Sequence, residues 1–150
     1  MRIILENFKC WENKTIDLKD DIFTLLSGKS GTGKTTILEA IVFALYGTRK
    51  KMTTYGKKSC KVTFEYKDMK IVRTKTPNVL KLNDEYEYED EAAQAIINKK
   101  FGENFDITGY IRQGINKSFI TMGPQDKLSF LERFAFQDVD LIKIKKESSK

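Results

Sequence analysis

The chain has 150 residues, a length that fits one domain with a hydrophobic core. Its formal net charge of +6 is equally consistent with an acidic partner such as nucleic acid and with an ordinary solvated surface. No apolar window is long enough to span a membrane, and Glu6 comes too early for a signal peptide, so we expect an intracellular protein of the cytoplasm or nucleus without a membrane partner. Histidine is absent and the two cysteines, Cys10 and Cys60, lie far apart, which argues against a zinc site, a disulfide scaffold and histidine-based acid–base catalysis.

Three strands are predicted in the first part of the chain. Residues 3–8 and 14–18 are predicted to form the first two strands, joined by a polar turn at Glu12 and Asn13. The apolar run at residues 22–26 predicts a third strand, which leads into a glycine-rich loop.

That loop, residues 28–35, matches G-x-x-x-x-G-K-[ST], the P-loop that surrounds nucleotide phosphates. Glycines let successive backbone N–H groups point inward, and the helix predicted from Lys34 to about Tyr46 adds the positive end of its dipole. Lys34 is expected to neutralise β- and γ-phosphate charge, and the Thr35 hydroxyl to bind Mg²⁺. The sequence therefore predicts an ATP·Mg²⁺ site, and its nucleotide-binding residues are Gly28, Ser30, Gly31, Thr32, Gly33, Lys34, Thr35 and Thr36.

Further strands and a helix are predicted after this helix. Period-two alternation predicts a hairpin from residues 61–66 and 70–74. Residues 79–82 and 85–88 extend it across a turn at Asn83 and Asp84, and a helical pattern resumes over 90–101. We interpret the acidic run at 85–91 as a polar edge strand and a helix start, not as a metal site.

A last helix is predicted to begin at Pro124, with Leu128, Leu131 and Phe134 on one face. Residues 138–150 become increasingly charged while Val139 and Ile142 keep an apolar spacing, and no helix stop signal follows them. We expect this helix to continue beyond Lys150.

Several of these segments together resemble the N-terminal ATPase lobe of the Rad50/SbcC/SMC group. They are Asn7-Phe8-Lys9 at the end of the first strand, Ile16-Asp17-Leu18 in the second, the P-loop, and the helix that ends Phe43-Ala44-Leu45-Tyr46-Gly47, which resembles the Rad50/SbcC branch most. The resemblance implies an α/β P-loop NTPase fold, namely the N-terminal lobe of an ABC-type ATPase head with an antiparallel β-subdomain. It also implies that residues 1–137 form the lobe and residues 138–150 begin a coiled-coil arm.

The same resemblance implies roles for two residues outside the P-loop. Tyr110-Ile111-Arg112-Gln113-Gly114 resembles the Q-loop of the family, so Gln113 is expected to bind Mg²⁺, sense the γ-phosphate and act in catalysis with Lys34. Lys9 stands where the family places a basic residue against the phosphates. The ordinary alternatives, a surface glutamine and a solvated lysine, stay open. Trp11 could stack on adenine, but we prefer packing between the strands.

Two motifs of the family are absent from this sequence: an apolar run that ends in Asp-Glu, the Walker B motif, and an ABC-type signature. The resemblance places both in a C-terminal lobe, so we expect half of an ATP site, with ATPase activity in the full head and little or none in these residues alone. The implied partners are the C-terminal lobe of the same protein, a second copy of the head in a homodimer, double-stranded DNA ends and an Mre11/SbcD-like nuclease.

The basic residues that follow the P-loop helix could track DNA phosphates or simply solvate a loop; they are Arg49, Lys50, Lys51, Lys57 and Lys58. Other functions also stay open: an SMC- or RecF-like chromosome or recombination ATPase, and a nucleotide-binding module without hydrolysis of its own. Two strands ahead of the P-loop argue against a small-molecule kinase, and the long separation of Gln113 from Lys34 argues against a transporter component.

Overall fold

The computed structural model describes residues 1–20, 22–47, 51–83, 88–102, 105, 109–110 and 119–135. The chain divides into two units, Met1–Phe105 and Asp106–Lys150. Gln113, Arg49, Lys50 and the proposed start of a coiled coil at 138–150 lie outside the described residues.

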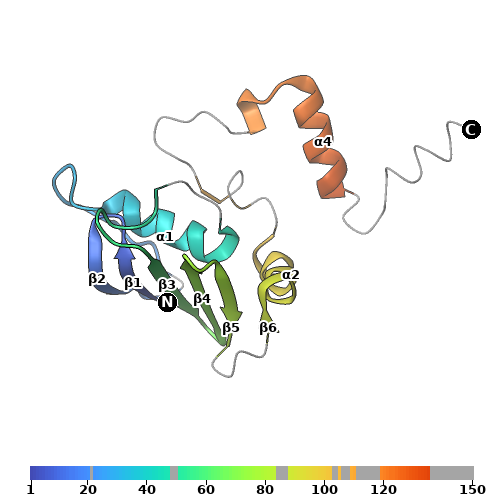
Figure 1. The fold of residues 1–150 in the computed structure, drawn as a ribbon. Helices are drawn as coiled ribbons and strands as arrows, with labels where there is room; N and C mark the ends of the chain where they lie inside the picture. Colours follow the sequence, from blue (N-terminus) through green and yellow to red (C-terminus); the bar gives the residue numbers. More distant parts are fainter. Residues whose placement is uncertain are drawn as a thin grey trace, which may run out of the picture. The chain divides into compact units, whose positions relative to one another are not determined.

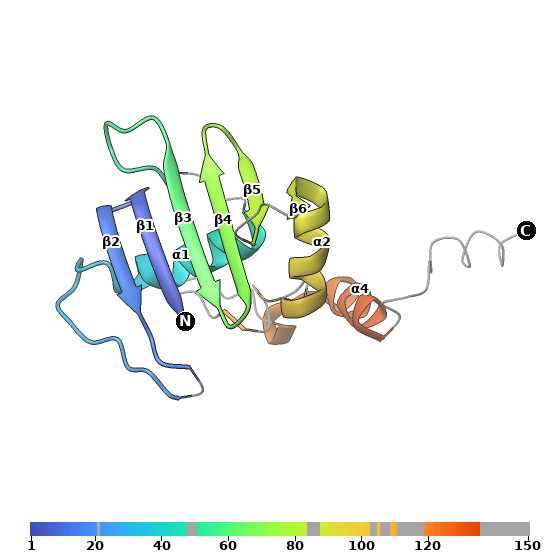
Figure 2. The ribbon, with the colours of Figure 1, turned by 90° about the horizontal axis from the view of Figure 1, so that it is seen from below.

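The first unit is built on one antiparallel sheet with the strand order β2-β1-β3-β4-β5-β6 (Figure 1). Its strands are β1 (Arg2–Phe8), β2 (Trp11–Asp17), β3 (Cys60–Tyr66), β4 (Met69–Lys75), β5 (Val79–Leu82) and β6 (Tyr88–Glu89). Two helices pack on it: α1 (Lys34–Tyr46) contacts β1, β3 and β4, and α2 (Asp90–Phe101) contacts β5 and β6. Figure 2 shows α1 crossing one face of the sheet, and no helix among the described residues of this unit covers the other face.

The core lies between the sheet and α1. Alternate strand residues point toward the helix, so Ile3 and Leu5 of β1 and Val62 of β3 are fully buried. Phe8 stacks obliquely on Phe43 of α1, with ring centroids 5.5 Å apart. Each fully buried side chain of this size stabilises the fold by about 1.5–3 kcal/mol, so this interface fixes α1, and with it the P-loop, to the sheet.

Most predicted elements are confirmed. The helix predicted over 90–101 is α2, and α1 runs from Lys34 to Tyr46 as expected. Each of these helices is followed by a glycine of positive φ, Gly47 or Gly102, that ends the hydrogen-bond ladder. The hairpin of β3 and β4 and its extension by β5 are also present, while Asp84 of the predicted turn and residues 85–87 of the last predicted strand lie outside the described residues.

The predicted turn at Glu12 and Asn13 was wrong, because both residues belong to β2. The chain turns at Lys9 and Cys10 instead, closed by the pair Phe8↔Trp11. Lys9 carries the positive φ that a tight turn needs although it is not glycine, so no glycine marks this turn in the sequence.

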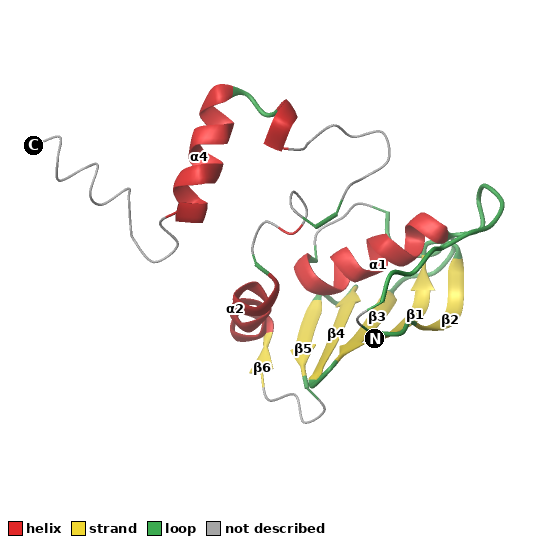
Figure 3. Ribbon diagram, turned by 180° about the vertical axis from the view of Figure 1, so that it is seen from behind, coloured by secondary structure: helices red, strands yellow, loops and turns green. Residues whose placement is uncertain are grey.

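The strand predicted at residues 22–26 was also wrong. The described segment between β2 and α1 is drawn as loop (Figure 3), and the side chains of Ile22, Phe23 and Leu25 are 59%, 92% and 78% exposed. A strand needs a neighbour for its backbone hydrogen bonds, and none of the described strands pairs with this segment.

The second unit contains a short 3-10 helix, Phe119–Thr121, and α4 (Pro124–Ala135), which begins at Pro124 as predicted. Phe119 packs on Phe130 of α4, with ring centroids 5.4 Å apart. Leu128 and Leu131 are 58% and 48% exposed, so the predicted apolar face is not buried by the described residues of this unit. None of the helices in the described ranges is long and apolar enough to cross a membrane.

Candidate nucleotide-binding site

The P-loop backbone turns in the way that its glycines allow. Gly31 and Gly33 have φ values of 81° and 87°, which side chains with a Cβ rarely adopt. Gly33 has a second reason to lack a side chain: a Cβ there would lie 2.8 Å from Cζ2 of Trp11. The Thr32 hydroxyl donates to the carbonyl of Lys29 at 2.8 Å and closes the loop on itself.

Helix α1 starts directly at the end of the loop. Its N-cap residue is Gly33, and no side chain of the described residues caps the helix. The first N–H groups of a helix have no acceptor within the helix, and the dipole adds positive potential at this end. The N-terminus of α1 is therefore suited to an anion such as phosphate.

The side chain of Lys34 lies across the loop that precedes it. Its ammonium group donates to the carbonyls of Gly28 at 2.8 Å and Lys29 at 2.7 Å. Thr35 follows on the exposed side of the helix, whereas Thr36 is buried and accepts a hydrogen bond from the Cys10 thiol at 3.6 Å. An ammonium group, helix N–H groups and a threonine hydroxyl are donors and ligands that fit a polyphosphate with Mg²⁺.

Lys9 is held beside the start of α1. Its ammonium group forms an ion pair with the Glu39 carboxylate, and the two side chains are only 29% and 17% exposed. Glu39 follows Thr35 by four residues, so both lie on one face of the helix, one turn apart. Lys9 is therefore not the freely solvated strand lysine that the sequence left open. Contact with phosphate stays a prediction.

Trp11 packs in the fold, as predicted, but the neighbour that its ring contacts is Gly33 of the P-loop, which the sequence did not predict. Its ring lies so close to Gly33 that only glycine fits there. The indole Nε1 is buried without a hydrogen-bond partner among the described residues, and the Lys14 ammonium lies 5.3 Å from the ring centroid. Trp11, the residue considered for adenine stacking, thus lies against the P-loop backbone at Gly33.

Sequence reasoning missed Arg73, which anchors the other end of α1. This buried side chain reaches from β4 and donates to the carbonyls of Ala44 at 2.9 Å and Leu45 at 3.2 Å and to the Gln94 side chain at 2.7 Å. Burial lowers the pKa of Arg73 to about 10. Side chains of a strand alternate between its two faces, so Arg73 lies on the same inward face as Ile71. This alternation was the sequence signal that could have predicted its burial.

Gly47 completes this anchor, because a Cβ there would lie 2.9 Å from Nη1 of Arg73. The side-chain amide of Gln94 on α2 also donates to the Leu45 carbonyl at 3.0 Å. A positive charge beside the last carbonyls of α1 complements the negative end of its dipole. Sheet, α1 and α2 are joined at this point.

The other predicted site residues divide into two groups. Lys51, Lys57 and Lys58 are exposed, and Lys57 lies 3.5 Å from the Glu12 carboxylate. Gln113, the predicted Mg²⁺ ligand and γ-phosphate sensor, lies outside the described residues together with Arg49 and Lys50, so its role stays a prediction.

Comparison with known proteins identifies the family. A family model described as an AAA domain matches residues 2–150. Protein 050L of Invertebrate iridescent virus 6 is 42% identical over 97% of this chain, and protein 094L of Invertebrate iridescent virus 3 is 37% identical over 90% of it. The matches cover 13% and 16% of those viral proteins, so the chain spans only a small part of their length.

Relatives with descriptive names extend the match. The DNA double-strand break repair Rad50 ATPase of Methanococcus maripaludis is 29% identical over 83% of this chain and 14% of its own length. The SbcC component of the nuclease SbcCD from Staphylococcus epidermidis is 49% identical over 31% of this chain and 5% of its own length. The chain therefore belongs to the AAA domain family, within the Rad50/SbcC type of ATPase head.

Proposed function

We propose that this chain is the ATP-binding N-terminal half of a Rad50/SbcC-like DNA double-strand-break repair ATPase. The observation that carries the proposal is the P-loop geometry: Lys34 lies across a glycine loop at the uncapped N-terminus of α1. The names of the Rad50 and SbcCD relatives support the repair context.

In this proposal the P-loop residues hold ATP. The backbone from Gly28 to Gly33 and the first N–H groups of α1 surround the phosphates, and Lys34 leaves its loop carbonyls to neutralise β- and γ-phosphate charge. The nucleotide-binding residues also include Ser30 and Thr32 of the loop and Thr36 of the first turn of α1. Thr35 and Gln113 would hold Mg²⁺, which would offset phosphate charge when bound.

Lys9 and Gln113 act at the γ-phosphate in this scheme. In the nucleotide-free fold the Lys9 ammonium is paired with Glu39, one helical turn beyond Thr35, and it would leave this carboxylate to contact the phosphates. A neutral amide such as Gln113 binds Mg²⁺ through its oxygen without adding negative charge, so loss of the γ-phosphate changes its contacts.

A C-terminal lobe of the same protein is proposed to complete the head. Residues 1–137 are the N-terminal lobe, and residues 138–150 begin a coiled-coil arm that leads toward the second lobe. The exposed apolar segment supports this: Phe23 is 92% and Leu25 78% exposed, and such a run is stabilised by pairing as a strand. The missing catalytic carboxylate is expected in that lobe, so these residues alone should turn over ATP weakly or not at all.

The full machine is proposed to work by head engagement. ATP between two copies of the head holds them together, and hydrolysis releases them, so the nucleotide state controls double-stranded DNA-end binding and an associated Mre11/SbcD-like nuclease. An SMC- or RecF-like ATPase would use the same half-site with different partners.

Nucleotide binding by the Lys34→Ala variant tests the proposal. Losing the ammonium group removes about 2–3 kcal/mol of charge-assisted hydrogen bonding, so we expect ATP·Mg²⁺ affinity to fall about 30- to 150-fold in titration calorimetry. The control is Lys99→Ala, an exposed lysine at the far end of α2, which should bind as the unaltered chain does. Equal affinity in Lys34→Ala and the unaltered chain would refute the assignment.

A further inference from the structure

The loop that joins α1 to β3 presents an aromatic side chain to solvent. Tyr55 is 101% exposed, at the tip of residues 51–59, which we call the Tyr55 loop. We propose that the Tyr55 loop binds single-stranded nucleic acid, with an unpaired base stacked on the Tyr55 ring and the adjacent phosphates held by lysines. This inference rests on the proposed function and adds the form of nucleic acid and the residue that recognises it.

The tip of the loop is an ordered turn. Lys57 N–H donates to the Thr54 carbonyl at 3.0 Å, and the residue after Tyr55, Gly56, has a φ of 79°. This hydrogen bond and a positive φ at the third residue are the pattern of a type II turn. Because the turn holds its own shape, Tyr55 is kept away from the core although an aromatic ring favours burial.

The base of the loop is fixed to the sheet. Met52 is buried in the core, and its carbonyl accepts a hydrogen bond from the Lys9 N–H at 2.7 Å. Thr54 N–H donates to the Asn7 carbonyl at 2.9 Å, and Thr53 forms a β-bridge with Phe8. A ligand that binds a preformed loop loses less free energy to ordering, so a rigid base favours a binding role for the tip.

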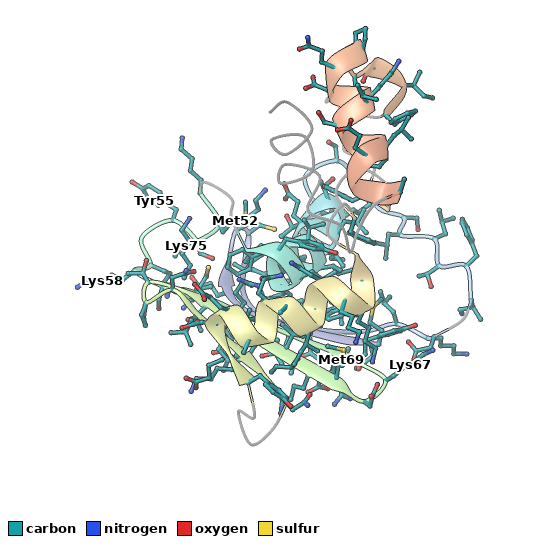
Figure 4. All side chains as sticks on the ribbon, turned by 90° about the vertical axis from the view of Figure 1, so that its right-hand side faces the viewer. Met52, Tyr55, Lys58, Lys67, Met69 and Lys75 are labelled. Carbon is teal, nitrogen blue, oxygen red and sulfur yellow. The ribbon has the colours of Figure 1, made fainter. Side chains whose placement is uncertain are left out.

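Basic side chains gather around the tip. Figure 4 shows Lys58 and Lys75 at the same end of the first unit as Tyr55, and Lys75 lies opposite Cys60, the first residue after the loop, in the β3–β4 pair. Lys51, Lys57 and Lys58 are exposed. Ammonium groups around an aromatic ring attract a polyanion and offer little to an apolar protein surface.

An unpaired base fits this arrangement better than a duplex does. Stacking needs access to the face of a base, and duplex DNA covers the faces of all but its two terminal base pairs by stacking them on one another, whereas every base of a single strand offers its face. Every base has such a face, so recognition by Tyr55 should tolerate sequence, and the lysines should make affinity fall with salt.

Fluorescence anisotropy with labelled (dT)20 and with a blunt duplex of the same length tests the proposal on the whole chain. Tyr55→Ala should weaken (dT)20 binding about tenfold, because base–aromatic stacking contributes about 1–3 kcal/mol per base. Tyr55→Phe, which keeps the ring, should stay within about twofold, and duplex affinity should not change. The matched control is Tyr88→Ala, which removes a half-exposed tyrosine of β6.

The outcomes separate this inference from the proposed function. Equal (dT)20 affinity in Tyr55→Ala, Tyr88→Ala and the unaltered chain overturns the stacking role, and duplex binding in the same samples leaves the repair function standing. If the unaltered chain does not bind (dT)20, the inference is wrong, and ATP·Mg²⁺ titration of the same chain decides the proposed function separately. If Tyr55→Ala instead changes the sedimentation of the chain without altering (dT)20 binding, the loop contacts protein and the inference is wrong.

Discussion

Replacing Arg73 by alanine tests the idea that one buried side chain fixes the P-loop helix to the sheet. The guanidinium donates to the Ala44 and Leu45 carbonyls and to Gln94. In Arg73→Ala, the Leu45 carbonyl keeps its bond from the Gln94 amide, but the Ala44 carbonyl and the Gln94 side-chain oxygen lose their donor. Among the described residues, the change therefore leaves these two acceptors without a side-chain donor, in a poorly hydrated region.

The magnitude follows from three contributions. The two acceptors cost about 2 kcal/mol each, and loss of the buried aliphatic stem costs about 2 kcal/mol more. Removal of the buried charge offsets part of this, since a pKa lowered to about 10 corresponds to a penalty of about 3 kcal/mol for holding Arg73 charged in the fold. We expect a net loss of about 3 kcal/mol in the free energy of unfolding.

Urea denaturation followed by far-UV circular dichroism measures this loss. At a typical slope of about 1–3 kcal/mol per molar urea, the midpoint should fall by about 1–3 M. The control is Arg2→Ala, because Arg2 is 53% exposed and its ion pair with Asp17 should contribute less than about 1 kcal/mol. A midpoint for Arg73→Ala within error of the unaltered chain, or equal losses in the two variants, would refute the reasoning.

Three further predictions concern the site itself. Trp11, the one tryptophan of the sequence, lies against Gly33 of the P-loop, so ATP·Mg²⁺ should change its fluorescence emission. An unchanged spectrum at saturating nucleotide would contradict nucleotide binding beside Trp11. Cys10 is exposed, whereas Cys60 is buried and its burial raises the pKa of its thiol. Near neutral pH a thiol reagent should therefore label Cys10 quickly and Cys60 only as the chain unfolds. Fast labelling of both thiols would disprove this. Glu39→Gln should release Lys9 toward the phosphates and raise ATP affinity several-fold at low salt in titration calorimetry. The gain should vanish in the double variant that also carries Lys9→Ala. No gain in Glu39→Gln alone would show that Glu39 does not restrain Lys9.

The parts of the fold that local sequence specifies could be predicted well. Helix α1 follows a P-loop whose spacing is diagnostic, and Gly47 and Gly102 mark the ends of α1 and α2. The β3–β4 hairpin shows period-two alternation within one short stretch. The P-loop residues of the candidate site came from the same kind of local signal.

The errors concern features that depend on distant partners or on backbone strain. A run such as residues 22–26 is apolar enough for a strand, but pairing depends on a neighbour that local sequence does not specify. Asn7 and Lys9 both adopt a φ of 51°, and neither is glycine, so the first turn had no visible signal. Arg73 was missed because its acceptors lie on α1 and α2, well separated from it in sequence.

The short turn that carries Lys9 has a consequence for how the two proposed sites communicate. Its main chain exchanges hydrogen bonds with Met52 and Thr54 at the base of the Tyr55 loop, while the Lys9 side chain reaches Glu39 on the helix that begins at the P-loop. A shift of the Lys9 main chain on nucleotide binding would therefore move, or strain against, the segment that presents Tyr55. Thermodynamic linkage makes the effect mutual: if ATP tightens the hold on a nucleic-acid strand by some factor, the strand tightens the hold on ATP by the same factor.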